Sequence, residues 1–233
     1  MLDEMSLCLN QVPMAATRAD YGDAIIARNV LGKQTESTRK ESFRRLRELY
    51  SLDPSTPVFF AYRELDRFDS QSRPVLSLLL ACARDPLLRS TIPVILSARE
   101  GDELGASQFD AAIERAFPGH MKPKIRAATA RHIASTWEQS GHLAGKFAKT
   151  RIRIEARPAA LTFALYLGTL QEVHGEAVFA TVWCQLLDLN APMARALALQ
   201  AHREGLLDLR AVGSVVEVSF PRFNEGFQPG ATL

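Results

Sequence analysis

The sequence predicts a mainly α-helical protein in which an N-terminal helical bundle precedes a C-terminal winged-helix unit with a small β-hairpin. Three observations predict this fold class. About six helical patterns precede residue 142, with almost no strand signal among them. Residues 192–204 form a further helical pattern that ends at Gly205, and the short apolar runs 206–210 and 215–220 follow it. Helix, helix and hairpin in this order are typical of a winged helix-turn-helix.

Periodicity, together with the residues that begin and end helices, predicts the elements of the N-terminal half. Residues 1–18 lack a clear period and suggest an irregular or short helical lead-in. Thr38 and Glu41 have the spacing of a capping box, which predicts a helix over 37–50. The other predicted helices cover 20–31, 57–68 with Phe68 packed inward, 74–84, 87–99 as one or two short helices, 107–117 and 124–141.

Residues 141–149 are polar and contain glycine, so they are the predicted domain boundary. The predicted domains are a helical bundle over 1–142, a winged-helix unit over 150–222 and a disordered tail over 223–233. Residues 151–154 alternate charged and apolar side chains, as a short strand does. Pro158 opens a helix over 159–173, which we take as the first helix of the winged-helix unit.

The helix over 192–204 has two different faces. Asn190 is a favourable N-cap for it, and Pro192 suits its first turn, where a missing N–H costs little. At 100° per residue, one face holds Met193, Ala194, Leu197, Ala198 and Ala201, which are expected to be buried. The opposite face holds Arg195, Leu199, His202 and Arg203.

Basic residues are concentrated in two segments of a chain whose overall net charge is only +2. Residues 28–47 contain seven Lys/Arg against two Glu, a local charge of +5, and residues 122–157 contain nine against two, a local charge of +7. Segregated positive charge is what a phosphate-binding surface requires. Ordinary solvated helix faces remain an equally good interpretation of either segment taken alone.

The chain has the composition of an intracellular globular protein. It has 233 residues, of which 47% are apolar and 23% charged. Its three cysteines, Cys8, Cys82 and Cys184, are widely spaced in apolar surroundings, which favours free thiols in a reducing cytoplasm. No basic signal region precedes an apolar run, and the longest run is too short to span a bilayer. We therefore expect a cytoplasmic protein without a membrane segment.

No pattern in the sequence predicts catalysis. The five histidines lack the spacing of a metal site, and the glycine-rich loops that bind nucleotides are missing, so neither a metal nor a cofactor is expected. Ser140 lies next to His142 in the sequence, but such a pair needs a third group that orients the histidine. We predict that the protein is not an enzyme.

Nucleic-acid binding is the function that the charge pattern favours. On the helix over 192–204, long or hydrogen-bonding side chains could enter a DNA groove: Arg195, His202 and Arg203. Phosphate contacts are predicted for Lys146, Lys149, Arg151, Arg153 and Arg210, and for Arg39 and Lys40 at a helix start. Leu199 lies in the middle of the outward face, which instead suits docking against another protein.

Three stretches resemble signature segments of the BrxA proteins of BREX anti-phage systems. The first is RNVLGK at 28–33, with the residues of 37–39 and 46–53 that follow it. The second is ARDPLLR at 83–89, and the third is STWEQSGHL at 135–143. The resemblance extends over about residues 25–220.

The resemblance implies a fold and a role that composition does not show. BrxA is similar in fold to NusB, a small all-helical RNA-binding factor, and it is a non-catalytic accessory component of systems that methylate host DNA and block phage replication. We therefore expect a NusB-like bundle that binds double-stranded DNA. The alternatives are a scaffold that recruits other BREX components and, by analogy with NusB, RNA binding.

Overall fold

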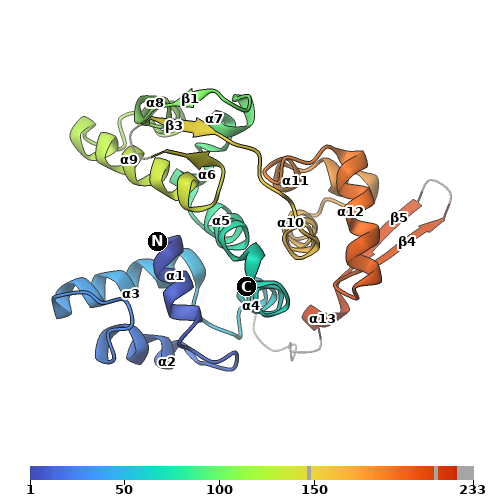
Figure 1. Cartoon of the computed structure of the whole chain (residues 1–233), viewed down its shortest axis with the longest axis horizontal. Helices are drawn as coiled ribbons and strands as arrows, with labels where there is room; N and C mark the ends of the chain where they lie inside the picture. The colour runs from blue at the N-terminus through green and yellow to red at the C-terminus, as the bar shows by residue number, and fades with distance from the viewer. Residues whose placement is uncertain (146–147, 213–214, 225–233) are drawn as a thin grey trace.

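The protein is mainly helical, as the sequence predicts, with two small antiparallel sheets (Figure 1). The structure is a computed structural model that describes residues 1–145, 148–212 and 215–224. Its α-helices are α1 (Leu2–Leu9), α2 (Arg18–Gly22), α3 (Glu36–Tyr50), α4 (Pro57–Phe68), α5 (Arg73–Arg84), α6 (Pro86–Arg89), α7 (Ile92–Ser97), α8 (Ala106–Ala116), α9 (Pro123–Gln139), α10 (Pro158–Leu170), α11 (Val182–Gln185), α12 (Ala191–Arg203) and α13 (Pro221–Asn224). A π-helical turn, η1 (Asp23–Ala27), and two 3₁₀ segments, η2 (Ser70–Ser72) and η3 (Gly175–Ala180), complete the helical part. The strands are β1 (Glu103–Leu104), β2 (Leu143–Ala144), β3 (Lys149–Arg151), β4 (Asp208–Val212) and β5 (Val215–Ser219).

Two of the first helices begin and end at other residues than predicted. Thr17 caps α2 and exchanges hydrogen bonds with Asp20, and the helical segment ends in η1 at Ala27 instead of continuing to residue 31. The predicted capping box of α3 is wrong, because the N-cap is Thr35, whose hydroxyl accepts from the Thr38 amide at 3.2 Å. Glu41 lies one turn further on and pairs with arginines of the same helix.

Helices α4 and α5 form the centre of the N-terminal half. The bounds of α4 agree with the prediction, and Phe59, Tyr62 and Leu65 on one face are buried. The prediction that Phe68 packs inward is wrong, since 45% of it is exposed. Phe68 is the last residue of α4, and the Arg222 guanidinium of α13 lies over its ring, 5.9 Å from the centroid. Apolar side chains all around α5 are buried, which confirms its predicted burial on several sides.

A small sheet occupies the segment that was predicted to separate two domains. Strand β3 lies between β1 and β2, so the predicted strand over 151–154 is instead β3 at Lys149–Arg151. One hydrophobic cluster of buried residues extends from Leu2 to Phe223, because α10 packs against both α4 and α5. The core is therefore continuous across the predicted boundary at residues 141–149.

Helix α12 packs through alanines, which bring it close to α10. Asn190 caps it as predicted, accepting a hydrogen bond from the Met193 amide at 3.0 Å. Ala194, Ala198 and Ala201 are fully buried. Met193 was expected on this face but is 43% exposed, since the small side chains leave its longer one outside the contact. The segment before α12 forms η3 and the short α11.

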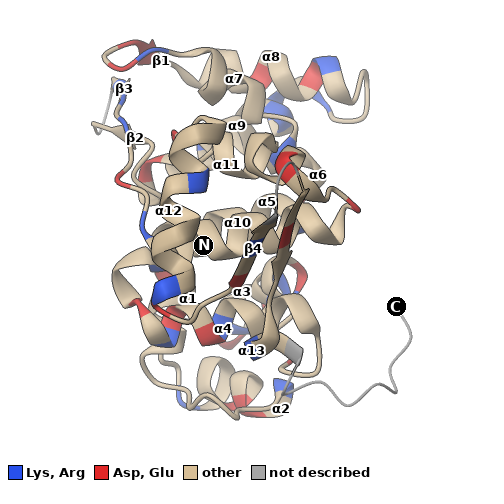
Figure 2. Ribbon diagram, turned by 90° about the vertical axis from the view of Figure 1, so that its right-hand side faces the viewer, with Lys and Arg blue, Asp and Glu red and all other residues tan. Residues whose placement is uncertain are grey.

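The β4–β5 hairpin extends from the body of the molecule at the right of Figure 1 and faces the viewer in Figure 2. Its register runs from the Asp208–Ser219 pair to the Val212–Val215 pair. The prediction of a disordered tail from residue 223 is wrong at its first residues, because Phe223 is buried in α13, 4.9 Å from the Tyr166 ring. The rest of that predicted tail, 225–233, lies outside the described residues.

Candidate nucleic-acid interface

The basic residues of segment 28–47 are mostly neutralised within the fold. The Arg39 guanidinium donates to the Ile26 carbonyl at 2.7 Å, so this predicted phosphate ligand instead fixes the start of α3 against the end of η1. Lys40 pairs with Glu36 at 2.7 Å on the exposed face of α3. Further ion pairs neutralise basic residues of this segment: Arg28–Asp23, Lys33–Glu4, Arg44–Glu41, Arg44–Glu48 and Arg45–Glu41.

Among the described members of the predicted basic set around β3, Lys149, Arg151 and Arg153, only Arg153 is left exposed. Lys149 pairs with Glu138 of α9, and Arg151 is 3% exposed and pairs with Asp188. The Arg153 guanidinium donates to the Asp188 carbonyl at 3.2 Å and lies at the surface. Lys146 lies outside the described residues.

Asp188 holds the chain that enters α12. Besides the ion pair with Arg151, its carboxylate accepts from the Ile154 amide at 2.9 Å, and its own backbone has φ 56°. A cavity of about 570 Å³ lies beside this joint and is lined by Arg151, Arg153, Asp188 and Asn190, among others. Because Arg151 and Asp188 neutralise each other, their role here is structural.

Ser140 and His142 form a hydrogen bond, which the sequence reasoning did not expect. The hydroxyl lies 2.9 Å from Nδ1, and Nε2 lies 2.7 Å from the carbonyl oxygen of Leu186. Ser140 is 2% and His142 0% exposed, and burial lowers the pKa of His142 to about 4. No substrate can reach a pair buried in this way, so it belongs to the core.

The outward face of α12 combines apolar and basic side chains. Leu199 is 49% exposed, as predicted, and Arg195 is occupied by an ion pair with Glu176 of η3. His202 lies at the surface, with Nδ1 3.2 Å from the Leu207 carbonyl. Arg203 is also exposed and has no ion pair with any described residue.

Arg210 lies close to the same end of α12, on β4. Its side chain is exposed and stands opposite Glu217 in the register of the hairpin. The hairpin begins near α12, because the Leu209 amide donates to His202 Nδ1 at 3.4 Å. His202 and Arg203 of the predicted groove residues and the predicted wing residue Arg210 therefore lie near one another at the C-terminal end of α12, whereas Arg195 lies near its start.

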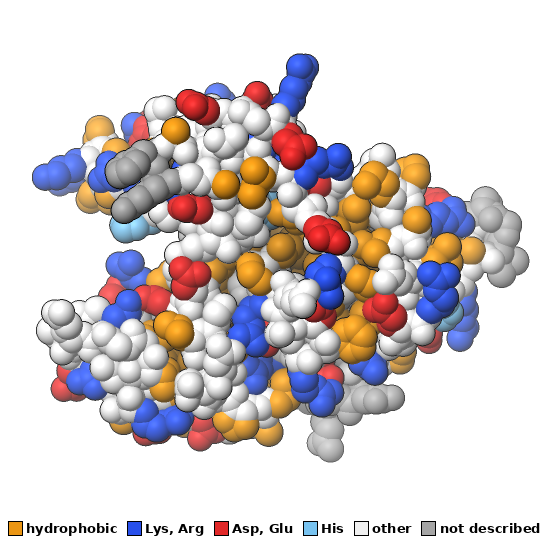
Figure 3. Space-filling model, in the orientation of Figure 1, with side chains coloured by type: hydrophobic (Ala, Val, Ile, Leu, Met, Phe, Trp, Pro, Cys, Tyr) orange, Lys and Arg blue, Asp and Glu red, His pale blue; other side chains and the backbone are white. Residues whose placement is uncertain are grey.

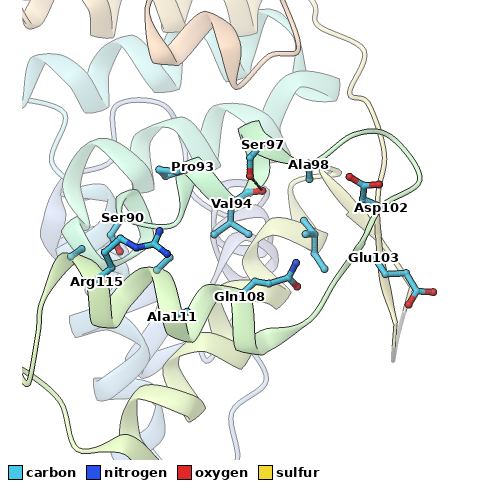
Figure 4. A pocket seen from close by; sticks show the side chains of 13 residues that line it. Ser90, Pro93, Val94, Ser97, Ala98, Asp102, Glu103, Gln108, Ala111 and Arg115 are labelled. Carbon is cyan, nitrogen blue, oxygen red and sulfur yellow. Dashed lines mark hydrogen bonds between the residues drawn. The ribbon is translucent and has the colours of Figure 1, made fainter.

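A groove of about 870 Å³ lies between α7 and α8 (Figure 4). Small or apolar side chains line its middle, with Arg115 at one end and Asp102 and Glu103 at the other. The Asp102 carboxylate accepts from the Arg99 amide at 2.7 Å, so it is held by its own loop. The two hydroxyls that line it, on Ser90 and Ser97, donate to the backbone carbonyls of Leu87 and Val94.

Comparisons with known proteins do not identify this chain: no family model, no curated protein and no solved structure matches it. Within the described residues, no three His, Cys, Asp or Glu side chains are grouped in a way that could hold a metal ion. None of the described helices combines the length and the apolar character that crossing a membrane requires.

Proposed function

We propose that the protein is a non-catalytic accessory component of a BREX-type phage defence system and that it binds double-stranded DNA. One observation carries the DNA-binding part. Three arginines, Arg153, Arg203 and Arg210, are exposed without an ion pair to any described residue, and they lie around the two ends of α12. The outward face between them is uncovered. This arrangement fits a helix that approaches a groove while arginines hold the phosphates on either side.

The proposed fold is a NusB-like bundle followed by a winged-helix unit. Its support is the order of elements, in which α10, α11 and α12 precede the β4–β5 hairpin. Superposing residues 158–219 on winged-helix domains, and the bundle on NusB, tests this proposal. A different spatial order of helices in either part contradicts it.

DNA binding is tested by a gel shift with a short duplex over a range of salt concentrations. Affinity should fall steeply as salt rises, because each neutralised phosphate contributes about 0.9 to the slope of log K against log salt. Charge reversal at Arg203 and Arg210 together should lower that slope by about 2. No retardation of the duplex even at low salt contradicts the proposal.

A matched control uses arginines that are exposed but already paired. Arg18 pairs with Asp53 and Arg67 with Glu64, both at 2.8–2.9 Å. The variant Arg18→Glu/Arg67→Glu changes the net charge by the same amount as Arg203→Glu/Arg210→Glu. It should leave the salt slope unchanged, which separates a local site from the effect of overall charge.

The BREX assignment rests on the sequence resemblance, and the residues that carry it are structural. The Asn29 side-chain oxygen accepts a hydrogen bond from the Lys33 amide at 2.8 Å. The Asp85 carboxylate, the cap of α6, accepts one from the Leu87 amide at 2.8 Å. Ser140 and His142 of the third stretch form the buried pair described above. Proteins that share a fold tend to share the residues whose hydrogen bonds fix local backbone conformation. The structural roles of Asn29, Asp85, Ser140 and His142 are therefore consistent with the resemblance.

The accessory role is tested by coexpression of the tagged chain with the other components of a BREX system. Copurification of at least one component is expected, and recovery of none contradicts the role. Competition between duplex DNA and RNA for the chain decides against the RNA alternative if RNA fails to displace the duplex.

Docking of another protein on α12 is the second candidate function. It is favoured by the exposure of Leu199 at 49% in the middle of the outward face of α12, because a large exposed apolar side chain there suits contact with another protein. Changing Leu199 to Asp should abolish recovery of such a partner and leave DNA affinity intact. Loss of DNA affinity in that variant would favour the groove role of α12.

A further inference from the structure

The first half of α9 bears positive charge that the fold does not neutralise. From His120 to Trp137 the chain contains no Asp or Glu, while Lys122, Lys124 and Arg131 are exposed and form no ion pair with a described residue. Helix α8 packs against α9, and its Asp110 and Glu114 are both held by Arg126 of α9. Lys, Arg and His side chains gather at this end of the α8–α9 lobe, at the left of Figure 3.

The spacing on α9 suits a phosphate backbone. Lys124 and Arg131 are seven residues apart, so they lie on one side of the helix, about 10 Å from each other along its axis. Ala128 stands between them and Ser135 follows one turn later, both only half-buried. A small residue between two basic ones allows a strand to approach closely, and a hydroxyl adds a hydrogen bond to phosphate.

This face is at the opposite end of the molecule from the arginines around α12. Figure 1 places the turn between α8 and α9 at the left end of the longest axis, and α12 with its hairpin at the right end. A short duplex held across α12 therefore leaves the α9 face open to solvent.

We propose that the outward face of α9 is a second, separate nucleic-acid surface, which holds a phosphate backbone, so that one molecule binds two duplex segments at once. The proposal rests on the proposed DNA binding at α12 and goes beyond it, because bridging requires both ends. The exposed Leu199 of α12 suits a groove in which thymine methyl groups are exposed, whereas the α9 face offers Lys124 and Arg131 with the small Ala128 between them and the Ser135 hydroxyl beyond. Binding at α9 is therefore independent of base sequence.

The test is a bridging assay with one duplex fixed to beads and a second, fluorescent duplex in solution. The wild-type chain should retain the fluorescent duplex on the beads. The variants Lys124→Glu/Arg131→Glu and Arg203→Glu/Arg210→Glu should each still shift a single duplex in a gel. Each should retain no more fluorescent duplex than beads without protein. The control Arg18→Glu/Arg67→Glu should bridge like the wild type, and unchanged melting temperatures show that the variants are folded.

The outcomes separate this inference from the proposed function. If the wild type shifts no duplex, DNA binding itself is contradicted, and the bridging proposal with it. If the wild type shifts a duplex but retains none on the beads, only the bridging proposal is overturned. Continued bridging by the α9 variant also overturns the bridging proposal. Such a result would mean that the second duplex binds elsewhere, for example on a second copy of the chain. If the α9 variant no longer shifts any duplex, the chain has a single DNA-binding site at α9, and the proposal of two sites is overturned.

Discussion

The Nε2 atom of His142 lies 2.7 Å from the carbonyl oxygen of Leu186, so an imidazole just before β2 binds the end of α11. A carbonyl oxygen only accepts hydrogen bonds, hence Nε2 carries the proton. The ring also packs edge-on against Trp137 at 5.2 Å between centroids. This contact joins α9 and the small sheet to the segment that leads into α12.

Acid should destabilise the protein through His142. Burial lowers the pKa of its imidazole from 6.5 to about 4. Between these two pH values the imidazole is protonated in the unfolded chain and neutral in the folded chain. The stability conferred by the neutral ring is complete above pH 6.5 and is lost as the pH falls to about 4. The loss is about 3 kcal/mol in the free energy of unfolding. Urea denaturation at a series of pH values measures it.

The matched variants for this prediction are His142→Gln and His132→Gln. Glutamine at 142 can still donate to Leu186 but does not titrate, so the pH dependence between 6.5 and 4 should become shallower by up to one proton. His132 is exposed on α9, and its replacement should leave the profile unchanged. Equal profiles for all three proteins contradict the assignment of the acid effect to His142.

Asp188→Ala should unfold the joint before α12. The change leaves the Arg151 guanidinium, with 4% of its side chain exposed, without its counter-charge, and it also removes the acceptor of the Ile154 amide. A buried charge deprived of its partner costs about 3–5 kcal/mol. Chemical denaturation gives the loss of stability. Glu36→Ala breaks the exposed pair with Lys40 and should leave the stability almost unchanged, because solvent screens that pair.

Asn190→Ala should destabilise the protein by about 1 kcal/mol, because the Met193 amide loses its acceptor at the start of α12. Asn190→Gly should cost only a few tenths of a kcal/mol, since glycine is itself tolerated as an N-cap. Thermal melting of the two variants side by side is the measurement. An equal cost for both would mean that the side-chain hydrogen bond contributes little.

Substitutions at two neighbouring positions on α12 should change the stability by very different amounts. Leu199→Ser changes an exposed residue and should shift stability by no more than about 0.5 kcal/mol. Ala198→Leu forces three extra carbon atoms into the fully buried contact with α10 and should cost about 1–3 kcal/mol. Denaturation midpoints test both, and a large effect at Leu199 would contradict the orientation of the helix.

Local signals account for the part of the fold that the sequence predicted well. The bounds of α4 and the Asn190 cap of α12 depend on signals within a few residues of each other. The capping box predicted at Thr38 was wrong, because local signals cannot distinguish between two equivalent capping residues. Thr35, three residues earlier, offers the same chemistry, and only the packed position of the helix selects between them.

The candidate site could be predicted only in part, because a charge count along the chain cannot include partners that lie elsewhere. The sequence by itself determined a mainly helical chain, the Asn190 cap of α12, the β4–β5 hairpin and the excess of basic residues between 122 and 157. Tertiary structure decided which of those charges are available. Arg151 is neutralised by Asp188 and Arg157 by Asp69, 37 and 88 residues away in the chain. Lys124 and Arg131 are exposed and form no ion pair with a described residue, whereas Arg126 of the same helix binds Asp110 and Glu114 of α8.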